Sequence, residues 1–341
     1  MEKKNIAVIA GGYSGEYVVS VNSAKTICEN LDKEKYNVHL VLIVKNKWVY
    51  IDDNEKEYPI DKNDFSATVN NKKILFDCAL ITIHGSPGED GRLQGYLEML
   101  DIPYTTAGLL ASALTFNKYF CNLLMTEWGI KTAKSIKHHI SENPDDSLIL
   151  SNINLPAFVK PNKGGSSLGT TFVSKPEKLM PAVKEAFEHD DEVYIEEYIE
   201  GTELTCGVFL HNDEIKVLPV TEIISKTKAQ FFDFKAKYTK GAADEITPAR
   251  ISDELTDRIQ EISAYLYDKL ELKGIARFDY ICKNDEIYFL ETNITPGMSA
   301  TSIVPQQAEV VGISITELFT MVIEETLKVK GHRAWGMGHG A

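Results

Sequence analysis

The sequence predicts an α/β layer at the N-terminus followed by α+β units. In residues 1–106, short apolar strands alternate with helical stretches, which is typical of a parallel α/β sheet. Beyond residue 107, strands gather around single helices and a long polar stretch interrupts them, which is typical of α+β units. With 341 residues, the chain is long enough for two or three domains, each with its own core.

The N-terminal unit, residues 1–106, shows apolar patterns of both periods. We expect strands at Ile6–Ala10, Val38–Ile43 and Ala79–Ile83, and helices at Val19–Leu31 and Leu93–Leu100. Glycine-rich segments follow the first and third of these strands. They lie at the edge where α/β sheets bind their ligands.

Two further units follow, residues 107–197 and 198–330. For the central unit we expect a helical segment at Ala107–Trp128, a helix at Glu177–His189, and strands at Phe158–Lys160, Thr170–Val173 and Val193–Glu197. For the C-terminal unit we expect strands at Leu204–Leu210 and Glu214–Val217, a helix at Asp253–Leu272, a hairpin of Ile275–Cys282 with Ile287–Leu290, and a last helix at Ser314–Val329. The irregular polar stretch 224–248 has the length of a lid or binding segment. Residues 331–341 are Gly-rich, and we expect them to form a tail.

Composition and charge exclude several classes of function. The formal net charge of −14 disfavours nonspecific nucleic-acid binding, because Lys and Arg hold phosphate backbones. The five scattered cysteines indicate free thiols in a reducing compartment rather than disulfides or a zinc site. The N-terminal segment contains no apolar run long enough for a signal peptide or a membrane span. We expect a soluble, cytoplasmic protein with neither a nucleic-acid nor a membrane partner.

The predicted hairpin carries a polar patch. Arg277 and Asp279 on its first strand, and Glu291 and Asn293 on its second, each stand two residues apart, so each pair shares a face. If residues 283–285 form an odd-numbered loop, all four side chains point the same way. A buried carboxylate pair needs a cation, which Arg277 supplies in part. The oxygen-only ligands Asp279, Glu291 and Asn293 point to Mg²⁺ or Mn²⁺.

Two polar residues emerge at the ligand-binding edge of the N-terminal sheet. Glu16 ends the segment Gly-Gly-Tyr-Ser-Gly-Glu, just before a predicted helix, and His84 begins His-Gly-Ser-Pro-Gly-Glu-Asp-Gly after a strand. Glu16 is either a partner of the helix dipole or a ligand for an ammonium group. His84 is either structural or functional, and its flanking glycines allow a ligand to approach the backbone closely.

A Gly/Ser loop connects two strands of the central unit, in the segment Phe158–Gly169. Lys160 precedes the glycines and a β pattern resumes after them, so this is not the loop-to-helix phosphate motif of the Walker type. We expect a hairpin flap over phosphates, with backbone N–H groups and the hydroxyls of Ser166 and Ser167 as donors. An ordinary flexible hairpin is the alternative, but it leaves Lys160 in an apolar strand without a partner.

Two other segments are candidates for contact with a ligand. Around the turn at Glu200-Gly201, the chain can present backbone groups and Glu196 to an adenine edge and Glu203 to a ribose, although an exposed acidic strand end has the same composition. The polar stretch contains an aromatic and basic cluster that ends in Lys237 and Tyr238. Exposed aromatic side chains usually cover something, and we expect this pair to close over the phosphate site.

Taken together, these segments resemble the D-alanine–D-alanine ligases of the ATP-grasp superfamily, over nearly the whole chain. The resemblance rests on Gly-Gly-Tyr-Ser-Gly-Glu16, His84-Gly-x-x-Gly-Glu-Asp-Gly91, Lys160-Pro-x-x-x-Gly-Ser-Ser-x-Gly169, Lys237-Tyr238, Arg277-x-Asp279, and Glu291-x-Asn293-x-x-Pro-Gly-Met298 with Ser302 beyond it. It implies an ATP-grasp fold behind an N-terminal substrate domain.

The resemblance also implies a two-step ligation for peptidoglycan synthesis. The carboxylate of one D-alanine attacks the γ-phosphate of ATP, and the amine of a second D-alanine then displaces phosphate from the acyl phosphate. In the family, residues matching Glu16, Ser166 and Tyr238 form a hydrogen-bonded triad around the first ammonium group. The match to His84 orients substrate or transfers protons, and the match to Ser302 binds the second carboxylate.

The resemblance assigns the ATP and metal contacts as well. Residues at the phosphate, adenine and ribose positions are Lys118, Lys160, Ser167, Glu196, Glu197, Tyr198, Ile199, Glu203 and Lys237. Asp279, Glu291 and Asn293 match the ligands of two Mg²⁺ ions, for which Mn²⁺ can substitute. Arg277 and the Gly297 backbone N–H are expected to stabilise the tetrahedral oxyanion. The family also suggests a homodimer.

One segment departs from the family pattern, and two alternatives remain open. Tyr17-Val18-Val19 is apolar where the family commonly carries a charged residue after the first glutamate. The alternatives are another ATP-grasp carboxylate–amine ligase and a nucleotide-binding protein of the same fold without turnover. Glu16, His84 and the Lys237-Tyr238 pair favour the dipeptide ligase over the first, and Arg277 with three metal ligands disfavours the second.

Overall fold

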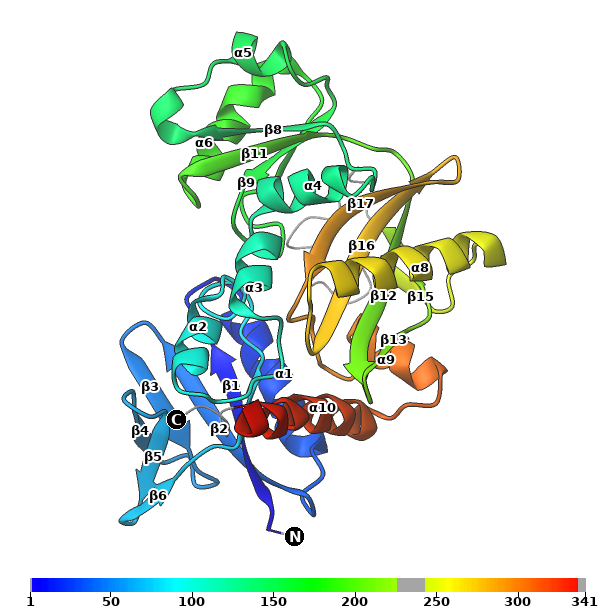
Figure 1. The fold of residues 1–341 in the computed structure, drawn as a ribbon. Coiled ribbons are helices and arrows are strands. Elements are labelled where there is room, and N and C mark those ends of the chain that lie inside the picture. The colour runs from blue at the N-terminus through cyan, green and yellow to red at the C-terminus, as the bar shows by residue number, and fades with distance from the viewer. Residues whose placement is uncertain (1, 226–242, 337–341) are drawn as a thin grey trace.

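The computed structural model describes residues 2–225 and 243–336, with side chains up to Lys328, and it contains three sheets with helices packed against them (Figure 1). In Figure 1 the central unit lies at the top, the N-terminal unit below it, and the C-terminal sheet beside them. Lys237, Tyr238 and the end of the predicted tail, residues 337–341, lie outside the described residues.

The N-terminal sheet has seven strands in the order β6-β5-β4-β3-β2-β1-β7. Its elements are β1 Lys4–Gly11, α1 Tyr17–Asn30, β2 Tyr36–Val44, β3 Lys47–Ile51, β4 Glu57–Asp61, β5 Ser66–Val69, β6 Lys72–Ile74, β7 Cys78–Ile81 and α2 Arg92–Met99. The predicted parallel layer is right for β2, β1 and β7, but β3 to β6 extend it in antiparallel order. Strands β4 to β6 are short and mostly polar, and they are joined by tight turns such as Asn70-Asn71, with both φ angles positive, so the apolar pattern did not reveal them. Strand β3 does carry an apolar run, Trp48 to Ile51, which was missed.

The central sheet has four antiparallel strands in the order β10-β9-β11-β8. Its unit comprises α3 Leu109–Phe116, α4 Lys118–Glu127, β8 Ser135–His139, α5 Asp146–Leu150, β9 Ala157–Pro161, β10 Thr171–Val173, α6 Leu179–Phe187 and β11 Glu192–Glu197, with short 3-10 helices at Ile140–Glu142 and Pro176–Lys178. The single helical segment expected over 107–128 is wrong in one respect. Asn117 adopts extended angles, and its side chain accepts a hydrogen bond from the backbone N–H of Phe120, so α3 ends and α4 begins there.

The C-terminal sheet has the order β15-β14-β12-β16-β17, with β13 also paired to β12. Its elements are β12 Thr202–His211, β13 Glu214–Val217, β14 Thr221–Ser225, β15 Ala243–Ile246, α8 Asp253–Lys269, β16 Ile275–Lys283, β17 Glu286–Asn293, α9 Ile303–Val310 and α10 Ile315–Gly336. Two expectations need correction. Both described ends of the supposedly irregular stretch 224–248 are strands, and α10 runs beyond the expected end at Val329 into the range assigned to the tail.

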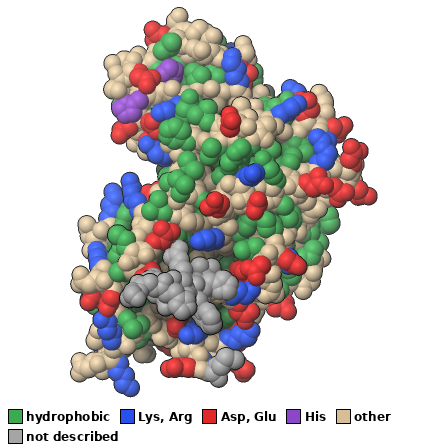
Figure 2. Space-filling view, viewed as in Figure 1, with side chains coloured by type: hydrophobic (Ala, Val, Ile, Leu, Met, Phe, Trp, Pro, Cys, Tyr) green, Lys and Arg blue, Asp and Glu red, His purple; other side chains and the backbone are tan. Residues whose placement is uncertain are grey.

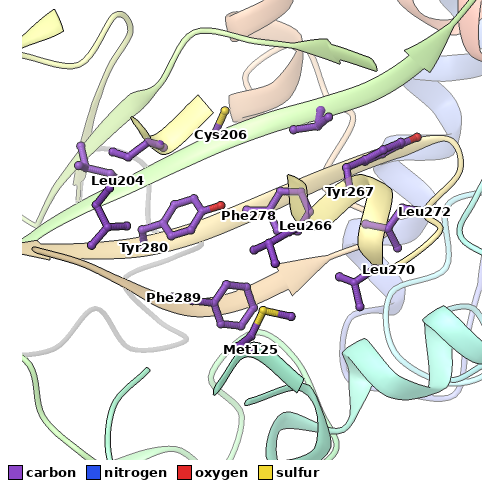
Figure 3. Close-up of a cluster of buried hydrophobic side chains, with 14 of the residues drawn as sticks. Met125, Leu204, Cys206, Leu266, Tyr267, Leu270, Leu272, Phe278, Tyr280 and Phe289 are labelled. Carbon is purple, nitrogen blue, oxygen red and sulfur yellow. The ribbon is translucent and has the colours of Figure 1, made fainter. Parts of the chain in front are cut away.

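The sheets fall within the three expected ranges, but helices pack across them, so the boundaries at 106 and 197 stay predictions. Figure 3 shows Phe278, Tyr280 and Phe289 of the β16–β17 hairpin packed among Leu266 of α8 and Met125 of α4. The C-terminal α10 packs between the C-terminal sheet and the N-terminal unit, in a core that holds Phe209 of β12 together with Ile6 and Ala24. Because strand side chains alternate, burial of Phe278 and Tyr280 under α8 turns Arg277 and Asp279 to the opposite face.

The face in Figure 2 shows Lys and Arg interspersed with Asp and Glu, without a continuous basic field in the coloured region. In residues 2–225 and 243–336, no helix is long and apolar enough to cross a membrane.

Candidate active site

A cavity of about 510 Å³ lies between the central and C-terminal sheets. This volume is within the range of small-molecule sites. The central side contributes strand and flap residues, and the C-terminal side contributes residues of β12, β14, β16 and β17. Among the expected site residues, those that line it are Lys118, Lys160, Ser166, Ser167, Glu196, Glu197, Tyr198, Ile199, Glu203, Asp279 and Glu291.

The polar patch on the hairpin forms, although the loop prediction was wrong. Lys283 pairs with Glu286, leaving a two-residue turn, Asn284-Asp285, in which both φ angles are positive, at 52° and 62°. These angles suit the type I′ turn of a tight hairpin. An even-numbered turn alone would put Glu291 on the wrong face.

A β-bulge restores the alignment. The register shifts between Asp279 and Tyr280, so that Tyr280 pairs with Phe289 but Asp279 pairs with Glu291 and Arg277 with Asn293. Leu290 is the extra residue. Bulges of this kind commonly redirect side chains next to functional sites. The four polar side chains therefore share one face, as expected, through a different backbone feature.

Asp279 is the centre of this patch. Its Oδ1 accepts hydrogen bonds from Arg277 Nε at 2.8 Å and Thr205 Oγ1 at 2.5 Å, and its Oδ2 accepts from Arg277 Nη2 at 2.7 Å and Asn293 Nδ2 at 2.9 Å. The Asp279 residue is only 5% exposed. Burial alone would lower the pKa of Arg277, but the charge of Asp279 and its hydrogen bonds raise it above its ordinary value. Arg277 is therefore a permanent cation in the patch.

The donor set fits a hard divalent cation. Asp279, Glu291 and Asn293 can offer two carboxylates and one amide oxygen. Elsewhere too, the described residues form no group of three or more His, Cys, Asp or Glu side chains that could hold a metal. Mg²⁺ characteristically takes one or two carboxylates and completes its shell with water or phosphate oxygens. The four donors on Asp279 use the capacity of its carboxylate, so a cation must displace one. Rotation of the Asn293 amide replaces its N–H donor by an oxygen.

Two lysines and an acid lie at the central side of the cavity. Lys160 Nζ is 2.6 Å from Glu196 Oε1, and the two side chains are 16% and 6% exposed. Glu196 is therefore paired with Lys160. To bind an adenine edge, Glu196 must either share its carboxylate with Lys160 or give up that ion pair. Lys118, the first residue of α4, donates to the Gly164 carbonyl oxygen at 2.5 Å, and burial lowers its pKa.

The residues expected at the adenine end come from the β11–β12 connection. Tyr198 packs edge-on against Phe158 and Phe172, with ring centroids 5.8 and 5.3 Å apart. Glu197 accepts hydrogen bonds from the Asn154 backbone and side chain, so its carboxylate is engaged on the protein. Glu197 still lines the cavity, but its carboxylate is bound to Asn154.

The Gly/Ser loop between β9 and β10 reaches the N-terminal unit. Ser166 Oγ donates a hydrogen bond to Glu16 Oε1. Ser166 and Ser167 have positive φ angles of 51° and 58°, and the Leu168 backbone N–H donates to the Gly165 carbonyl. A side chain on Gly165 would lie 3.1 Å from both Glu16 oxygens, so the loop backbone approaches the Glu16 carboxylate closely there. The loop is a defined turn, and Ser166 serves the Glu16 end of the site.

Glu16 and His84 are brought together as predicted. Glu16 is 8% exposed and precedes α1, but its side chain makes no cap hydrogen bond and turns to Ser166 instead. The Ser14 hydroxyl connects the two segments, because it donates to the His84 carbonyl at 3.1 Å and accepts from the Glu16 backbone N–H at 3.3 Å. His84 Nε2 is buried without a hydrogen-bond partner among the described residues. Burial, and then the charge of Arg277, lower the pKa of His84 to about 4, so its ring is neutral near pH 7.

Gly297 and Ser302 lie together after β17. A side chain on Gly297 would come within 3.0 Å of Ser302 Oγ, and Ser302 Oγ accepts a hydrogen bond from the Ser299 backbone N–H at 3.1 Å. The neighbouring Met298 backbone N–H donates to Ser23 of α1 at 3.4 Å. This segment is therefore held against the helix that follows Glu16.

Sequence reasoning missed several residues that support the site. Thr205 stands directly opposite Asp279 on β12 and donates to it, and Gln307 of α9 is fully buried with hydrogen bonds to Thr205 and Gly207. Glu89 binds Gly85 and Thr295, although it belongs to a motif already recognised as functional. Only the register of β12 against β16 could have revealed Thr205. Lys237 and Tyr238 lie outside the described residues.

Comparison with known proteins gives a consistent family match. Residues 5–107 match the family model described as D-ala D-ala ligase N-terminus, and residues 124–324 match D-ala D-ala ligase C-terminus. The chain is 48% identical to the D-alanine--D-alanine ligase of Azobacteroides pseudotrichonymphae over 94% of this chain and 99% of that relative. Among solved structures, it resembles the VanG D-Ala:D-Ser ligase of Enterococcus faecalis, with a TM-score of 0.84, 33% identity, and coverage of 95% of this chain and 100% of that one. It likewise resembles the D-alanine--D-alanine ligase of Bacillus anthracis, with a TM-score of 0.79, 33% identity, and coverage of 97% and 99%.

Proposed function

The chain belongs to the D-alanine–D-alanine ligase family, and we propose that the residues around its cavity bind ATP and two D-alanines in the roles set out below. It is an ATP-dependent carboxylate–amine ligase with an ATP-grasp fold, which forms D-alanyl-D-alanine for peptidoglycan synthesis. The observation that carries the assignment of roles is the hydrogen bond from Ser166 to Glu16. This bond joins the flap, which lines the cavity, to the N-terminal unit. The part of the cavity proposed for the ATP phosphates therefore lies next to Glu16, which is proposed to bind the amino acid.

In the first step, the carboxylate of one D-alanine attacks the γ-phosphorus of ATP, and ADP leaves. Glu16, held by Ser166, binds the ammonium group of this D-alanine. His84 is neutral, so it orients the substrate without adding a charge that would repel the ammonium group. Lys118 and Lys160 on the central side of the cavity bind phosphate oxygens.

ATP must compete for Lys160. The ammonium group of Lys160 is paired with Glu196 at 2.6 Å, and their site is nearly closed to water. A phosphate oxygen that approaches Lys160 joins this pair, and Glu196 becomes available to the adenine side. Glu197, Tyr198, Ile199 and Glu203 complete the adenine and ribose positions, and Ser167 provides a backbone N–H in the flap.

In the second step, the amine of the other D-alanine attacks the acyl carbon, and phosphate leaves from the tetrahedral intermediate. Arg277 uses Nε and one N–H of Nη2 on Asp279, so its remaining N–H groups can stabilise the oxyanion together with the Gly297 backbone N–H. Ser302, adjacent to Gly297, binds the carboxylate of the second D-alanine.

Asp279, Glu291 and Asn293 would hold Mg²⁺, or Mn²⁺ in its place, and two ions are expected. When bound, such ions neutralise the negative charge that develops on the phosphates during transfer. Asp279 orients Arg277, and Thr205 orients Asp279.

The roles of Lys237 and Tyr238 rest on the sequence resemblance alone. We propose that Lys237 binds phosphate and that Tyr238 completes a triad with Glu16 and Ser166. A cytoplasmic location and a homodimeric assembly are proposals with the same support.

Phosphate release tests the function. With ATP, Mg²⁺ and D-alanine, the protein should release phosphate and ADP and form one dipeptide per ATP. D-Serine should be tested as a second acceptor, because the VanG D-Ala:D-Ser ligase is 33% identical over 95% of this chain. Phosphate release no faster than in the absence of any amino acid would refute the proposal.

A further inference from the structure

One carboxyl group joins the N-terminal unit to the C-terminal sheet beside the proposed site. Glu89, in the loop between β7 and α2, accepts a hydrogen bond from the Gly85 backbone N–H through Oε2 and one from Thr295 Oγ1 through Oε1, each at 2.6 Å. Thr295 follows β17 and lies 206 positions further along the chain. Glu89 therefore binds both sides of the junction at once.

On the N-terminal side, Glu89 fixes the segment that carries His84. Gly85 follows His84, and its φ of +69° favours glycine. A side chain there would lie 3.0 Å from Ser14 and 3.5 Å from Glu16 Oε2, so the Gly85 backbone lies directly beside the Glu16 carboxylate. Movement of Gly85 would thus shift both residues proposed to bind the first D-alanine.

On the other side, Glu89 fixes the segment proposed to bind the second D-alanine. Thr295 is 5% exposed and lies between Asn293, a proposed metal ligand, and Gly297, a proposed oxyanion donor. Its hydroxyl also lies 3.4 Å from the Ile83 carbonyl oxygen, a longer contact than the bond to Glu89. Without Glu89, the longer contact with Ile83 is the one hydrogen bond that the described residues would leave between the Thr295 hydroxyl and the N-terminal unit.

Glu89 lies in surroundings that disfavour its charged form. Burial, and then repulsion from Glu16, raise the pKa of Glu89 to about 7, while Thr295 and Gly85 oppose the shift. Repulsion from Glu291 also raises the pKa of Glu89, and Lys118 interacts with the charge of Glu89. A carboxyl group kept in such surroundings, beside another acid, is costly for stability alone.

We propose that Glu89 is a positioning residue, which sets the separation of the two D-alanine subsites by binding Gly85 of the first and Thr295 of the second. The proposal rests on the function proposed above. Its consequence concerns the acyl phosphate. When the subsites separate, the second amine reaches the acyl carbon less often, and water attacks the same carbon, giving back D-alanine and phosphate.

The test is the ratio of phosphate released to dipeptide formed. In the wild-type protein this ratio should be one. In Glu89→Ala and Thr295→Val it should rise to about two or more, with kcat for the dipeptide about tenfold lower and KM for ATP unchanged, because small misplacements near reacting groups cost rate steeply. If Glu89→Ala does not fold, as judged by circular dichroism, Thr295→Val carries the test.

Conservative variants separate positioning from loss of stability. In Glu89→Gln, the amide oxygen accepts from Gly85, and the amide nitrogen donates to Thr295, which retains the Ile83 carbonyl as acceptor. Glu89→Gln and Thr295→Ser should therefore restore the ratio to near one. Asp90→Ala is the matched control, since this neighbouring acid pairs only with Arg92 in the contacts described, at 2.9 Å, and its ratio should stay at one.

The outcomes distinguish the two proposals. A ratio of one in both Glu89→Ala and Thr295→Val would overturn the positioning role, even if kcat fell. An increase in KM for ATP that matched the fall in kcat would overturn it as well, because a general loss of structure moves both. If the wild-type protein itself releases no phosphate with D-alanine, the proposed function fails, and the role of Glu89 falls with it.

Discussion

Replacing Arg277 by lysine separates charge balance from transition-state stabilisation. Arg277 donates to both oxygens of Asp279, at 2.8 and 2.7 Å, from a side chain that is 19% exposed. Lysine keeps the charge but loses the planar fork, so at most one of these two hydrogen bonds survives. The lost charge-assisted bond should cost about 1.5–3 kcal/mol of stability.

The effect on catalysis should be larger and of a different kind. If the remaining N–H groups of Arg277 stabilise the oxyanion, kcat should fall by about 10²–10³, which corresponds to roughly 3–4 kcal/mol. KM for ATP should change little, because Arg277 lies outside the residues that line the cavity. Steady-state phosphate release and urea unfolding of the same preparations measure the two effects separately.

A matched control is present on the surface. Arg250 makes the same two-bond fork with Glu222, at 2.8 and 2.9 Å, but its side chain is 61% exposed. Arg250→Lys should change stability by about 1 kcal/mol or less and leave kcat unaltered. If Arg277→Lys retained kcat within about threefold of the wild-type value, a role in the transition state would be excluded, and Arg277 would only balance charge.

Three further changes have defined outcomes. Asp279→Asn should lower turnover mainly by weakening Mg²⁺ binding, so an Mg²⁺ titration should shift to higher concentration, and full activity at limiting Mg²⁺ would contradict it. Because burial lowers the pKa of His84 from 6.5 to about 4, the unfolded chain takes up this proton first as pH falls, and stability should drop by roughly 3 kcal/mol between about pH 6.5 and 4. In His84→Gln, the free energy of unfolding measured with urea should depend less on pH between about 6.5 and 4. An unchanged pH dependence would count against this role of His84. Lys160→Met leaves the carboxylate of Glu196, 6% exposed, without its ammonium partner and should cost about 3–5 kcal/mol. Adding Glu196→Gln should recover stability but not the KM for ATP, and recovery of both would show that Lys160 does not bind phosphate.

Sequence patterns predicted the fold class and proposed a site, but they missed several elements. Glu16, His84, Ser166 and Asp279 stand in short glycine-rich or alternating segments, where residue type and spacing limit the possible chemistry. The antiparallel strands β4 to β6 were missed because they are short and mostly polar and carry little apolar signal, whereas the apolar run of β3 was overlooked. The break between α3 and α4 was missed because one extended residue, Asn117, leaves the helical pattern nearly intact.

The hairpin shows why a correct conclusion can follow from a wrong step. Side-chain alternation predicted a shared face for Arg277, Asp279, Glu291 and Asn293, provided that the loop had an odd length. The turn has two residues, and a bulge at Leu290 supplies the missing one. Bulges depend on twist and on neighbouring strands, so local sequence does not specify them well.

By itself, the sequence determined the chemistry available to this protein: which side chains are acids, cations and glycines, and on which element each stands. These properties are local, because residue type and strand or helix period fix them within a few positions. Only the tertiary structure decided the partners. Glu16 with Ser166, Glu89 with Thr295 and Thr205 with Asp279 are separated by 150, 206 and 74 positions. Such pairs form because three sheets pack around one junction, and that packing depends on the whole core at once.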